Sequence, residues 1–311
     1  MIIKAEQLKK NFGSIQAVDG IDLEIQTGEI VGLLGPNGAG KSTTISMIST
    51  LYKPTSGKLY FDGKDIIKEP KWIKPHLGYV PQEIALYDSL SGYENLKYFG
   101  GLYGLSGTEL KKRIAAVSEI IGIDDRLKDT VSKYSGGMKR RINIGVALLH
   151  KPKLIIMDEP TVGIDPQSRN HILETVKRLN QEGMTVIYTS HYMEEVEAIC
   201  KNVYIMDHGK VIASGTQDAL IEQSQSHTSI RLKFEKEASP YMSEIKQISH
   251  VMAINKESEN EISLLVSGNG NSQKEVIHAV LGMDLGLVSF DVTKPNLEQV
   301  FLKLTGRGLR D

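Results

Sequence analysis

A glycine-rich segment, GPNGAGKST at residues 35–43, has the residue types that hold a polyphosphate. It fits the pattern GxxxxGK(S/T), in which glycines let successive backbone N–H groups turn toward phosphate oxygens. The start of a following helix adds partial positive charge at the same place. In this interpretation Lys41 reaches the β and γ phosphates, and Ser42 binds magnesium. The predicted loop consists of Gly35, Pro36, Asn37, Gly38, Ala39, Gly40, Lys41, Ser42 and Thr43.

Two adjacent acids, Asp158 and Glu159, end the apolar run LIIMDE at residues 154–159. A carboxylate at the end of a buried strand can hold Mg²⁺ through its water shell, so Asp158 is a candidate metal ligand. The next carboxylate, Glu159, is placed to take a proton from an attacking water. An isolated acidic pair is more often only the polar start of a loop. Together with the phosphate loop, the pair predicts hydrolysis of a nucleoside triphosphate.

Three apolar runs supply the strands that must position these residues: 30–35, 154–159 and 185–190. They are apolar without alternation, which is typical of central parallel strands buried on both faces. Between the last two runs, Ile172, Val176 and Leu179 recur at helical spacing and predict a helix packed on the sheet. The sequence therefore predicts an α/β fold built around a P-loop.

The chain changes character twice along its length. Residues from about 83 to 149 are mostly helical in pattern, with an apolar stripe at Leu110, Ile114 and Val117, and predict an inserted helical subdomain. After the polar stretch at 222–229, short strands and helices alternate again. We therefore expect an ATPase domain at 1–223 and a small C-terminal α+β accessory domain at 224–311.

Composition limits the class of protein. Hydrophobic residues at 40% and charged residues at 24% are ordinary for a folded globular chain, and a net charge of −1 gives no general field for nucleic acid. A single cysteine, Cys200, fits a reducing compartment. The N-terminus does not have a secretory pattern, and no apolar run approaches the ~18 residues of a membrane span. Work at a membrane would need another chain.

A further motif, Tyr134-Ser135-Gly136-Gly137-Met138, lies upstream of the acidic pair and resembles the LSGGQ signature of ABC ATPases. Alone, such a segment is commonly a turn or a helix start. In that family Ser135, Gly136 and Gly137 form a second phosphate cradle for the nucleotide held by the other subunit. Tyr134 replaces the usual leucine and Met138 the usual glutamine, while the serine and both glycines are intact.

The resemblance covers roughly residues 1–220 and implies roles for four more positions. Gln82, after GYVP, resembles the glutamine that contacts magnesium or water and senses the membrane partner. Asp165, in GIDP, resembles the aspartate of the loop that crosses the dimer interface. His191 resembles the switch histidine near the γ-phosphate, and Phe12 takes the place of the aromatic, usually tyrosine, that stacks on adenine. Taken singly, each has a plainer interpretation as an exposed loop residue, a proline turn, a polar strand end or a packing residue.

The resemblance also implies cofactors and partners. We expect ATP and Mg²⁺ (Mg2+) as ligands, a homodimer or a pair with a related ATPase subunit, and separate transmembrane permease subunits. The chain would then be a peripheral protein at the cytoplasmic face of the cell membrane. The segments YSGGMKRR and PNLEQVFLKLTGR resemble the daunorubicin-resistance branch of multidrug exporters. We expect no nucleic acid, and interpret the basic run at 139–141 as a solvated or interface face.

Two alternatives remain open at this point. A non-transport ABC ATPase acting on ribosomes or DNA usually has two cassettes or long coiled-coil insertions, neither of which occurs here. A P-loop kinase or GTPase is disfavoured because no NKxD-like motif is present, and Ser135 to Gly137 would have no role. The transported cargo is not encoded in this chain.

Overall fold

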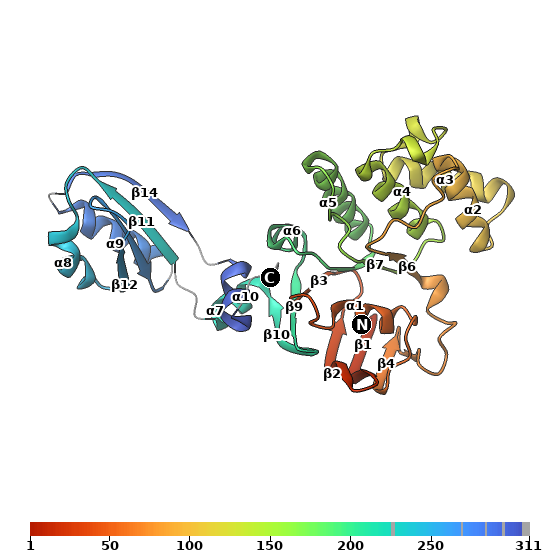
Figure 1. The fold of residues 1–311 in the computed structure, drawn as a ribbon, viewed down its shortest axis with the longest axis horizontal. Coiled ribbons are helices and arrows are strands. Elements are labelled where there is room, and N and C mark those ends of the chain that lie inside the picture. The colour runs from red at the N-terminus through yellow and green to blue at the C-terminus, as the bar shows by residue number, and fades with distance from the viewer. Residues whose placement is uncertain (225–227, 269, 284, 294–295, 307–311) are drawn as a thin grey trace. The chain divides into compact units, whose positions relative to one another are not determined.

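The computed structural model describes residues 1–224, 228–268, 270–283, 285–293 and 296–306. It divides into two compact units, Met1–Gln217 and Asp218–Gly306 (Figure 1). This division falls at the start of α7 (Gln217–Gln223), whereas the predicted boundary lies at its end. The polar stretch used for the prediction, 222–229, begins only at the last two residues of this helix. The end of α7 belongs with the second unit because Lys303 Nζ, from α10 (Leu297–Thr305), donates to the Ser224 carbonyl.

The first unit begins with an antiparallel sheet in the order β2-β1-β4-β5. The sequence analysis did not separate this sheet from the central one. Long strands with alternating buried and exposed residues pair here, as in a sheet with one face on the core. Its strands are β1 (Ile3–Phe12), β2 (Ile15–Ile25), β4 (Ser56–Phe61) and β5 (Lys64–Asp65).

The central sheet has the order β10-β9-β3-β8-β7-β6. Five neighbouring strands are parallel, and only β10 at the edge runs antiparallel. The three apolar runs are adjacent, as β3, β8 and β7, and every residue in them is buried, which confirms the prediction of central strands. The strands are β3 (Ile30–Leu34), β6 (Leu77–Val80), β7 (Leu154–Met157), β8 (Thr185–Tyr188), β9 (Asn202–Asp207) and β10 (Lys210–Thr216).

The parallel arrangement places three sequence-distant segments at one edge of the sheet. The phosphate loop follows β3, the acidic pair follows β7 and His191 follows β8. Register pairs Gly32 with Tyr188 and Met157 with Tyr188, so the carboxyl ends of these strands meet. Ligand sites in open α/β sheets lie at this edge.

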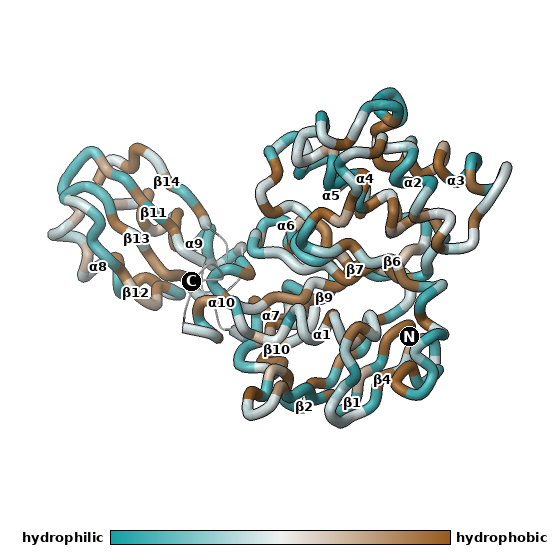
Figure 2. The backbone as a smooth tube through the Cα atoms, turned by 45° about the vertical axis from the view of Figure 1, so that its right-hand side comes forward, coloured by the Kyte–Doolittle hydropathy of each residue, from teal (hydrophilic) through white to brown (hydrophobic). Residues whose placement is uncertain are grey.

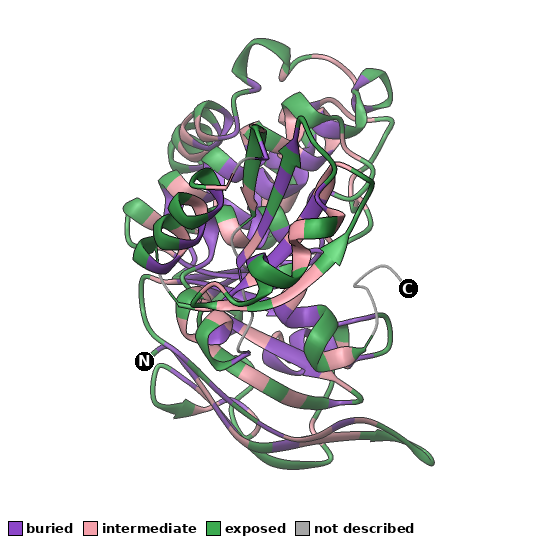
Figure 3. Ribbon diagram, turned by 90° about the vertical axis from the view of Figure 1, so that its left-hand side faces the viewer, coloured by how far each residue is buried: buried purple, intermediate pink, exposed green. Residues whose placement is uncertain are grey.

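One hydrophobic core joins both sheets of the first unit. It contains Ile3 and Leu23 from the antiparallel sheet, Val31 and Leu33 from β3, and Ile45 from α1 (Lys41–Ile48). Apolar segments (brown) follow the inner strands in Figure 2, and Figure 3 shows buried residues (purple) along strands and helices of the interior. Each fully buried Leu or Ile contributes about 1.5–3 kcal/mol. The phosphate loop is therefore anchored between two well-packed layers.

The predicted helical subdomain contains α2 (Gly92–Leu102), α3 (Gly107–Ile120) and α4 (Gly136–Leu148). Ser91 and Glu94 form a reciprocal capping box at the start of α2. The stripe at Leu110, Ile114 and Val117 is buried. The helices α5 (Pro166–Gln181) and α6 (Met193–Ile199) belong to the remainder of the unit, and short 3₁₀ turns cover Lys74–His76, Asp124–Arg126 and Val131–Lys133.

The second unit contains an antiparallel sheet in the order β12-β13-β11-β14. Ile230, Leu232 and Phe234 alternate along β11 and are buried, as the period of two predicts. The remaining elements are β11 (Thr228–Phe234), a 3₁₀ turn at Ser239–Tyr241, α8 (Met242–Lys246), β12 (Val251–Lys256), β13 (Glu261–Val266), α9 (Gly270–Leu281), β14 (Leu287–Thr293) and α10. The strand β12 and the helix α8 were not predicted.

Candidate nucleotide site

The glycine-rich segment forms a tight turn between β3 and α1. Gly40 has φ 100°, in the left-handed region that favours glycine, and a Cβ there would lie 2.6 Å from the Ala17 carbonyl oxygen. At Gly35 a Cβ would lie 2.5 Å from the Met206 carbonyl oxygen. These two positions need glycine because backbone from other strands approaches the loop.

The loop lines a pocket of about 500 Å³ at the carboxyl edge of the central sheet. The pocket joins the loop to Gln82, Glu159 and His191, which come from three other segments. Four lining residues were not predicted, because no motif marks the start of β2 or the turn after β9. The complete lining is Ile15, Gln16, Ala17, Asn37, Gly38, Ala39, Gly40, Lys41, Ser42, Thr43, Gln82, Glu159, His191 and His208.

Lys41 lies almost fully buried beneath this loop, at 5% exposure. Its Nζ donates to the Gly35 carbonyl at 2.6 Å and to the Pro36 carbonyl at 3.1 Å. Burial lowers the pKa of the Lys41 ammonium, while the nearby charges of Glu159 and Asp158 act in the opposite direction. The lysine thus joins the phosphate loop to the acidic pair electrostatically.

The acidic pair is held by a residue that the sequence analysis missed, Thr189. Its Oγ1 donates to Asp158 Oδ1 at 2.8 Å and accepts from the Glu159 backbone N–H at 2.9 Å. Thr189 is fully buried directly after β8. A polar residue at the end of an apolar strand was the signal in the sequence that could have identified it. Glu159 has φ 48°, a backbone conformation that is costly for a non-glycine residue and clusters at functional sites.

Glu159 is the centre of the three predicted catalytic side chains. Gln82 Nε2 donates to its Oε2 at 2.9 Å, and His191 Nε2 lies 2.6 Å from its Oε1. Burial raises the pKa of the Glu159 carboxyl, and the neighbouring Asp158 adds to this, while His191 and Lys41 oppose it. A buried carboxylate with a raised pKa and a fixed orientation has the properties of a general base.

The polar groups that line the pocket fit ATP with bound magnesium. The side chain of Lys41 and a loop of backbone N–H groups suit phosphate, while Ser42 and Gln82 present oxygen donors to the same pocket. The Nδ1 atom of His191 is buried without a hydrogen-bond partner among the described residues, which leaves it available to a bound group. Asp158 does not line the pocket, so it fits a role toward a metal through water rather than direct contact.

The signature residues and Asp165 form a second group. Ser135 caps α4 by accepting from the Met138 N–H at 3.2 Å, and Asp165 caps α5 by accepting from the Ser168 N–H at 2.9 Å. A Cβ on Gly137 would lie 2.1 Å from Ser168 Oγ, so a close approach of the two helix starts requires glycine. None of Ser135, Gly136, Gly137 and Asp165 belongs to the lining of the nucleotide pocket described above.

Phe12 ends β1, across a hairpin from the pocket residue Ile15. The ring is 42% exposed and packs edge-on against Tyr52, with centroids 5.4 Å apart. Lys10 Nζ lies 4.9 Å from the ring centroid. Phe12 is therefore beside the pocket but outside its lining.

The interpretation of the basic run at 139–141 as a solvated or interface face is wrong for Arg140, which is buried. Arg140 is 3% exposed, and it donates to the Pro81 carbonyl at 2.6 Å and to the Gln82 carbonyl. Arg141 donates to the Gly122 carbonyl at 2.7 Å. A guanidinium can satisfy several carbonyls at once, so the run fastens α4 to neighbouring segments.

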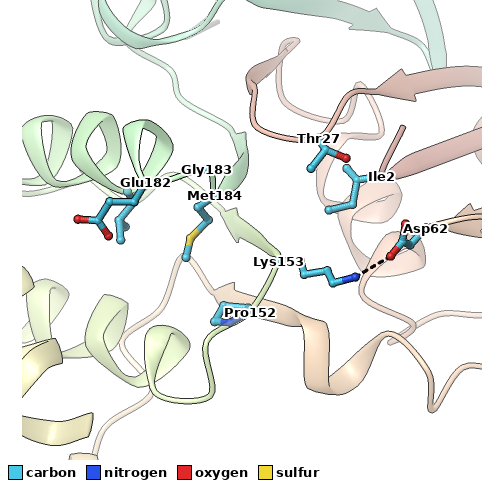
Figure 4. Close-up of a pocket in the computed structure, with 9 residues that line it drawn as sticks. Ile2, Thr27, Asp62, Pro152, Lys153, Glu182, Gly183 and Met184 are labelled. Atoms are coloured by element: carbon cyan, nitrogen blue, oxygen red, sulfur yellow. Dashed lines mark hydrogen bonds and ion pairs between the residues drawn. The ribbon is translucent and has the colours of Figure 1, made fainter. Parts of the chain in front are cut away.

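Another pocket, of about 400 Å³, lies at the opposite edge of the central sheet (Figure 4). Its residues Pro152 and Lys153 precede β7, and Gly183 and Met184 precede β8. Across it Lys153 Nζ pairs with Asp62 Oδ2 at 2.7 Å. It contains none of the predicted phosphate-binding residues.

Comparison with known proteins defines the class. Residues 18–162 match the family model described as ABC transporter. A curated relative, the linearmycin resistance ATP-binding protein LnrL of Bacillus subtilis, is 50% identical over 314 residues, with 100% of both chains covered. The chain therefore belongs to the ATP-binding subunits of ABC transporters, and it is an ATP-binding ATPase.

Other relatives agree on this class. The daunorubicin/doxorubicin resistance ATP-binding protein DrrA of Streptomyces peucetius is 33% identical and covers 99% of this chain and 94% of its own. A solved ATP-binding subunit of an ABC transporter has a TM-score of 0.65 at 30% identity, covering 72% of this chain and 93% of its own. A dimeric cassette bound to ADP and Pi has a TM-score of 0.63 at 27% identity, covering 69% and 98%. Nothing favours the ribosome or DNA alternative.

None of the helices in the described part of the chain combines the length and the apolar character that a membrane crossing requires.

Proposed function

We propose that the chain hydrolyses magnesium-bound ATP in composite sites shared by two subunits, and that this drives export through a separate permease. One observation carries the proposal. The pocket of a single chain brings together the phosphate loop, Gln82, Glu159 and His191 but not the signature residues. Ser135 and Gly136 are exposed and do not line the pocket of their own chain. They are therefore free to complete the phosphate site of a second copy.

Within one chain the chemistry follows from the contacts of Glu159. Its carboxylate accepts a proton from the attacking water, while Gln82 and His191 hold its two oxygens and fix its orientation. Lys41 stabilises the charge on the β and γ phosphates. Ser42 and Gln82, with Asp158 through a water, would hold magnesium, which would supply positive charge against the developing phosphate charge. Phe12 is placed to stack on adenine at the pocket rim.

The proposed partner subunit is a second copy or a related ATPase. Ser135, Gly136 and Gly137 of one subunit would cap the γ-phosphate held by the other, and Asp165 would lie at the interface. The dimeric relative bound to ADP and Pi supports this assembly.

The proposed membrane partner is a separate permease at the cytoplasmic face of the membrane. An exposed aromatic pair follows Gln82 in the chain: Tyr87 is 47% and Tyr98 is 45% exposed, with ring centroids 5.1 Å apart. Exposed aromatics of this kind mark protein interfaces. Because the names of LnrL and DrrA refer to resistance against linearmycin and daunorubicin, a drug-exporting permease is the expected partner.

The decisive experiment is a comparison of ATP turnover by the wild-type chain and by Lys41→Ala. Removing the ammonium should abolish turnover because the phosphates lose their neutralising charge. Lys112→Ala, on an exposed face of α3, is the matched control and should retain wild-type turnover. Wild-type turnover by Lys41→Ala would overturn the proposed site.

The second unit is proposed to be an accessory domain that affects dimer stability or regulation rather than nucleotide binding. All the motifs predicted to bind nucleotide lie before it, and it has its own buried core. A chain ending near residue 223 should therefore still bind ATP. A folded truncated chain without ATP binding would contradict this role.

A further inference from the structure

A fully buried carboxylate, Glu195, lies next to the nucleotide site without lining it. It belongs to the short helix α6 and is 0% exposed. Its Oε2 accepts from three hydroxyl groups: Thr161 Oγ1 at 2.8 Å, Tyr188 OH at 2.8 Å and Ser190 Oγ at 2.6 Å. Its Oε1 lies 2.7 Å from Arg169 Nε. We call these five residues the Glu195 cluster.

The four partners come from the segments that carry the proposed catalytic residues. Thr161 is two residues after Glu159, and Ser190 immediately precedes His191. Arg169 lies in the first turn of α5, where its backbone N–H donates to the carbonyl of the helix cap, Asp165, at 2.9 Å. One carboxylate therefore connects the acidic loop, the histidine loop and the Asp165 turn.

The cost of burying this charge indicates that the cluster is built as a unit. A buried carboxylate costs several kcal/mol unless it is paired and hydrogen-bonded. Here charge-assisted bonds from three hydroxyls and the Arg169 ion pair offset that cost. The neighbouring Glu194 provides the contrast: its side chain is 86% exposed, and its own contact with Arg169, 3.5 Å from Oε2 to Nη2, is an exposed ion pair that contributes at most about 1 kcal/mol.

We propose that Glu195 is a positioning residue for ATP hydrolysis, which holds the Glu159 and His191 loops in register so that the two side chains meet at 2.6 Å. The inference rests on the proposed function of Glu159. Glu195 touches no lining residue through these bonds, so it acts through the loops. Its four partners all lie outside residues 35–43, which bind the phosphates.

The position of Glu195, away from the phosphate loop, predicts different effects on kcat and on ATP affinity. Loss of the Glu195 charge should lower kcat because the base and the histidine lose their common anchor. Affinity for ATP should stay close to wild type because the phosphate loop is packed between other strands. A side chain that only supports the fold would instead lower the melting temperature and the number of ATP sites, and kcat per folded, ATP-binding molecule would stay at the wild-type value.

The experiment compares full-length Glu195→Gln with Glu194→Gln in thermal unfolding, ATP binding and steady-state turnover. We expect Glu195→Gln to lower kcat by at least about 10-fold with the Kd for ATP within about 3-fold of wild type. Glu194→Gln should change neither. An unchanged kcat, or equal losses in kcat and ATP affinity, would overturn the inference.

A second variant keeps the test informative if Glu195→Gln folds poorly. Thr161→Val removes one hydroxyl without changing side-chain volume, and should lower kcat less than Glu195→Gln, again with ATP affinity retained. Combined with Glu195→Gln, it should add less than its effect alone, because the Thr161 bond is one of the contacts that Glu195→Gln already weakens. Full additivity of the two effects would contradict a shared role.

Glu159→Gln, measured in parallel, separates this inference from the proposed function. If Glu159→Gln turns over ATP at the wild-type rate, the catalytic assignment of Glu159 fails, and the Glu195 inference fails with it. If Glu159→Gln is inactive while Glu195→Gln is fully active, only the positioning role fails.

Discussion

At the scale of single residues, Glu159 combines burial, a left-handed backbone and two side-chain partners. The burial and the backbone conformation cost stability, the two partners offset part of that cost, and together they orient one carboxylate toward a pocket. Such a residue is expected where chemistry requires it. Two predictions test this, one on turnover and one on stability.

Glu159→Gln keeps the size of the side chain and removes the base. Turnover should fall by about 10²–10⁴-fold, the usual effect of losing a general base. Binding of ATP should remain, so the variant should accumulate as an ATP-bound dimer in size-exclusion chromatography with ATP and magnesium. Asp158→Asn is the comparison, because loss of a magnesium partner should also weaken nucleotide binding. A Glu159→Gln chain that stays monomeric with ATP bound would contradict this.

The raised pKa of Glu159 predicts a pH-dependent difference in stability. Burial lifts the pKa of this carboxyl above its usual 4.5, so the folded chain binds the proton more tightly than the unfolded chain. The stability that the folded chain gains from binding this proton is complete below pH 4.5 and is lost as pH rises through the folded-state pKa. Without nucleotide, Glu159→Gln should therefore melt at a higher temperature than wild type at pH 8. This difference in melting temperature should become smaller as pH falls. Glu119→Gln, an exposed change, should show no such trend.

At the scale of elements, α4 and the Gln82 segment are joined by Arg140. The helix that begins with the signature therefore holds the backbone of a residue that contacts Glu159. A movement of the helical subdomain would reach the base through this connection. The basic run is thus part of the scaffold of the site.

Arg140→Met tests this connection. The change leaves the Pro81 and Gln82 carbonyls without their donors, and should lower the free energy of unfolding by about 2 kcal/mol. Lys139→Met is the matched control from the same helix, because its ion pair with Asp88, whose side chain is 62% exposed, contributes at most about 1 kcal/mol. Urea unfolding of both variants measures the difference. Equal losses would show that Arg140 has no special role.

At the scale of the whole molecule, the proposed dimer would build each site from the phosphate loop of one subunit and the signature of the other. Lys41→Ala should disable the phosphate-loop half of a site, and Ser135→Arg the signature half. Each variant alone should be inactive. A mixture should recover part of the turnover, because a mixed dimer contains one site with both halves intact. No recovery in verified heterodimers would indicate sites complete within one chain.

The sequence alone determined the chemistry of this protein. The phosphate loop, the acidic pair and the signature are local, because their function depends on glycine freedom, charge and helix starts within a few residues. The buried strands β3, β7 and β8 were predictable for the same reason, since a double-sided core demands continuous apolar residues. Even the alternation in β11 was readable before the structure.

Tertiary structure alone decided how these parts meet. Thr189 and Glu195 belong to no motif, Arg140 lies in the signature segment without a role predicted for it, and a threonine, an arginine and a glutamate are usually surface residues. Their roles arise only when parallel strands bring β7 and β8 together and when α4 and α6 pack beside them. The separate antiparallel sheet and β12 also depended on long-range pairing, which local patterns do not encode. Contacts between residues far apart in the chain thus set the geometry of a site whose chemistry was local.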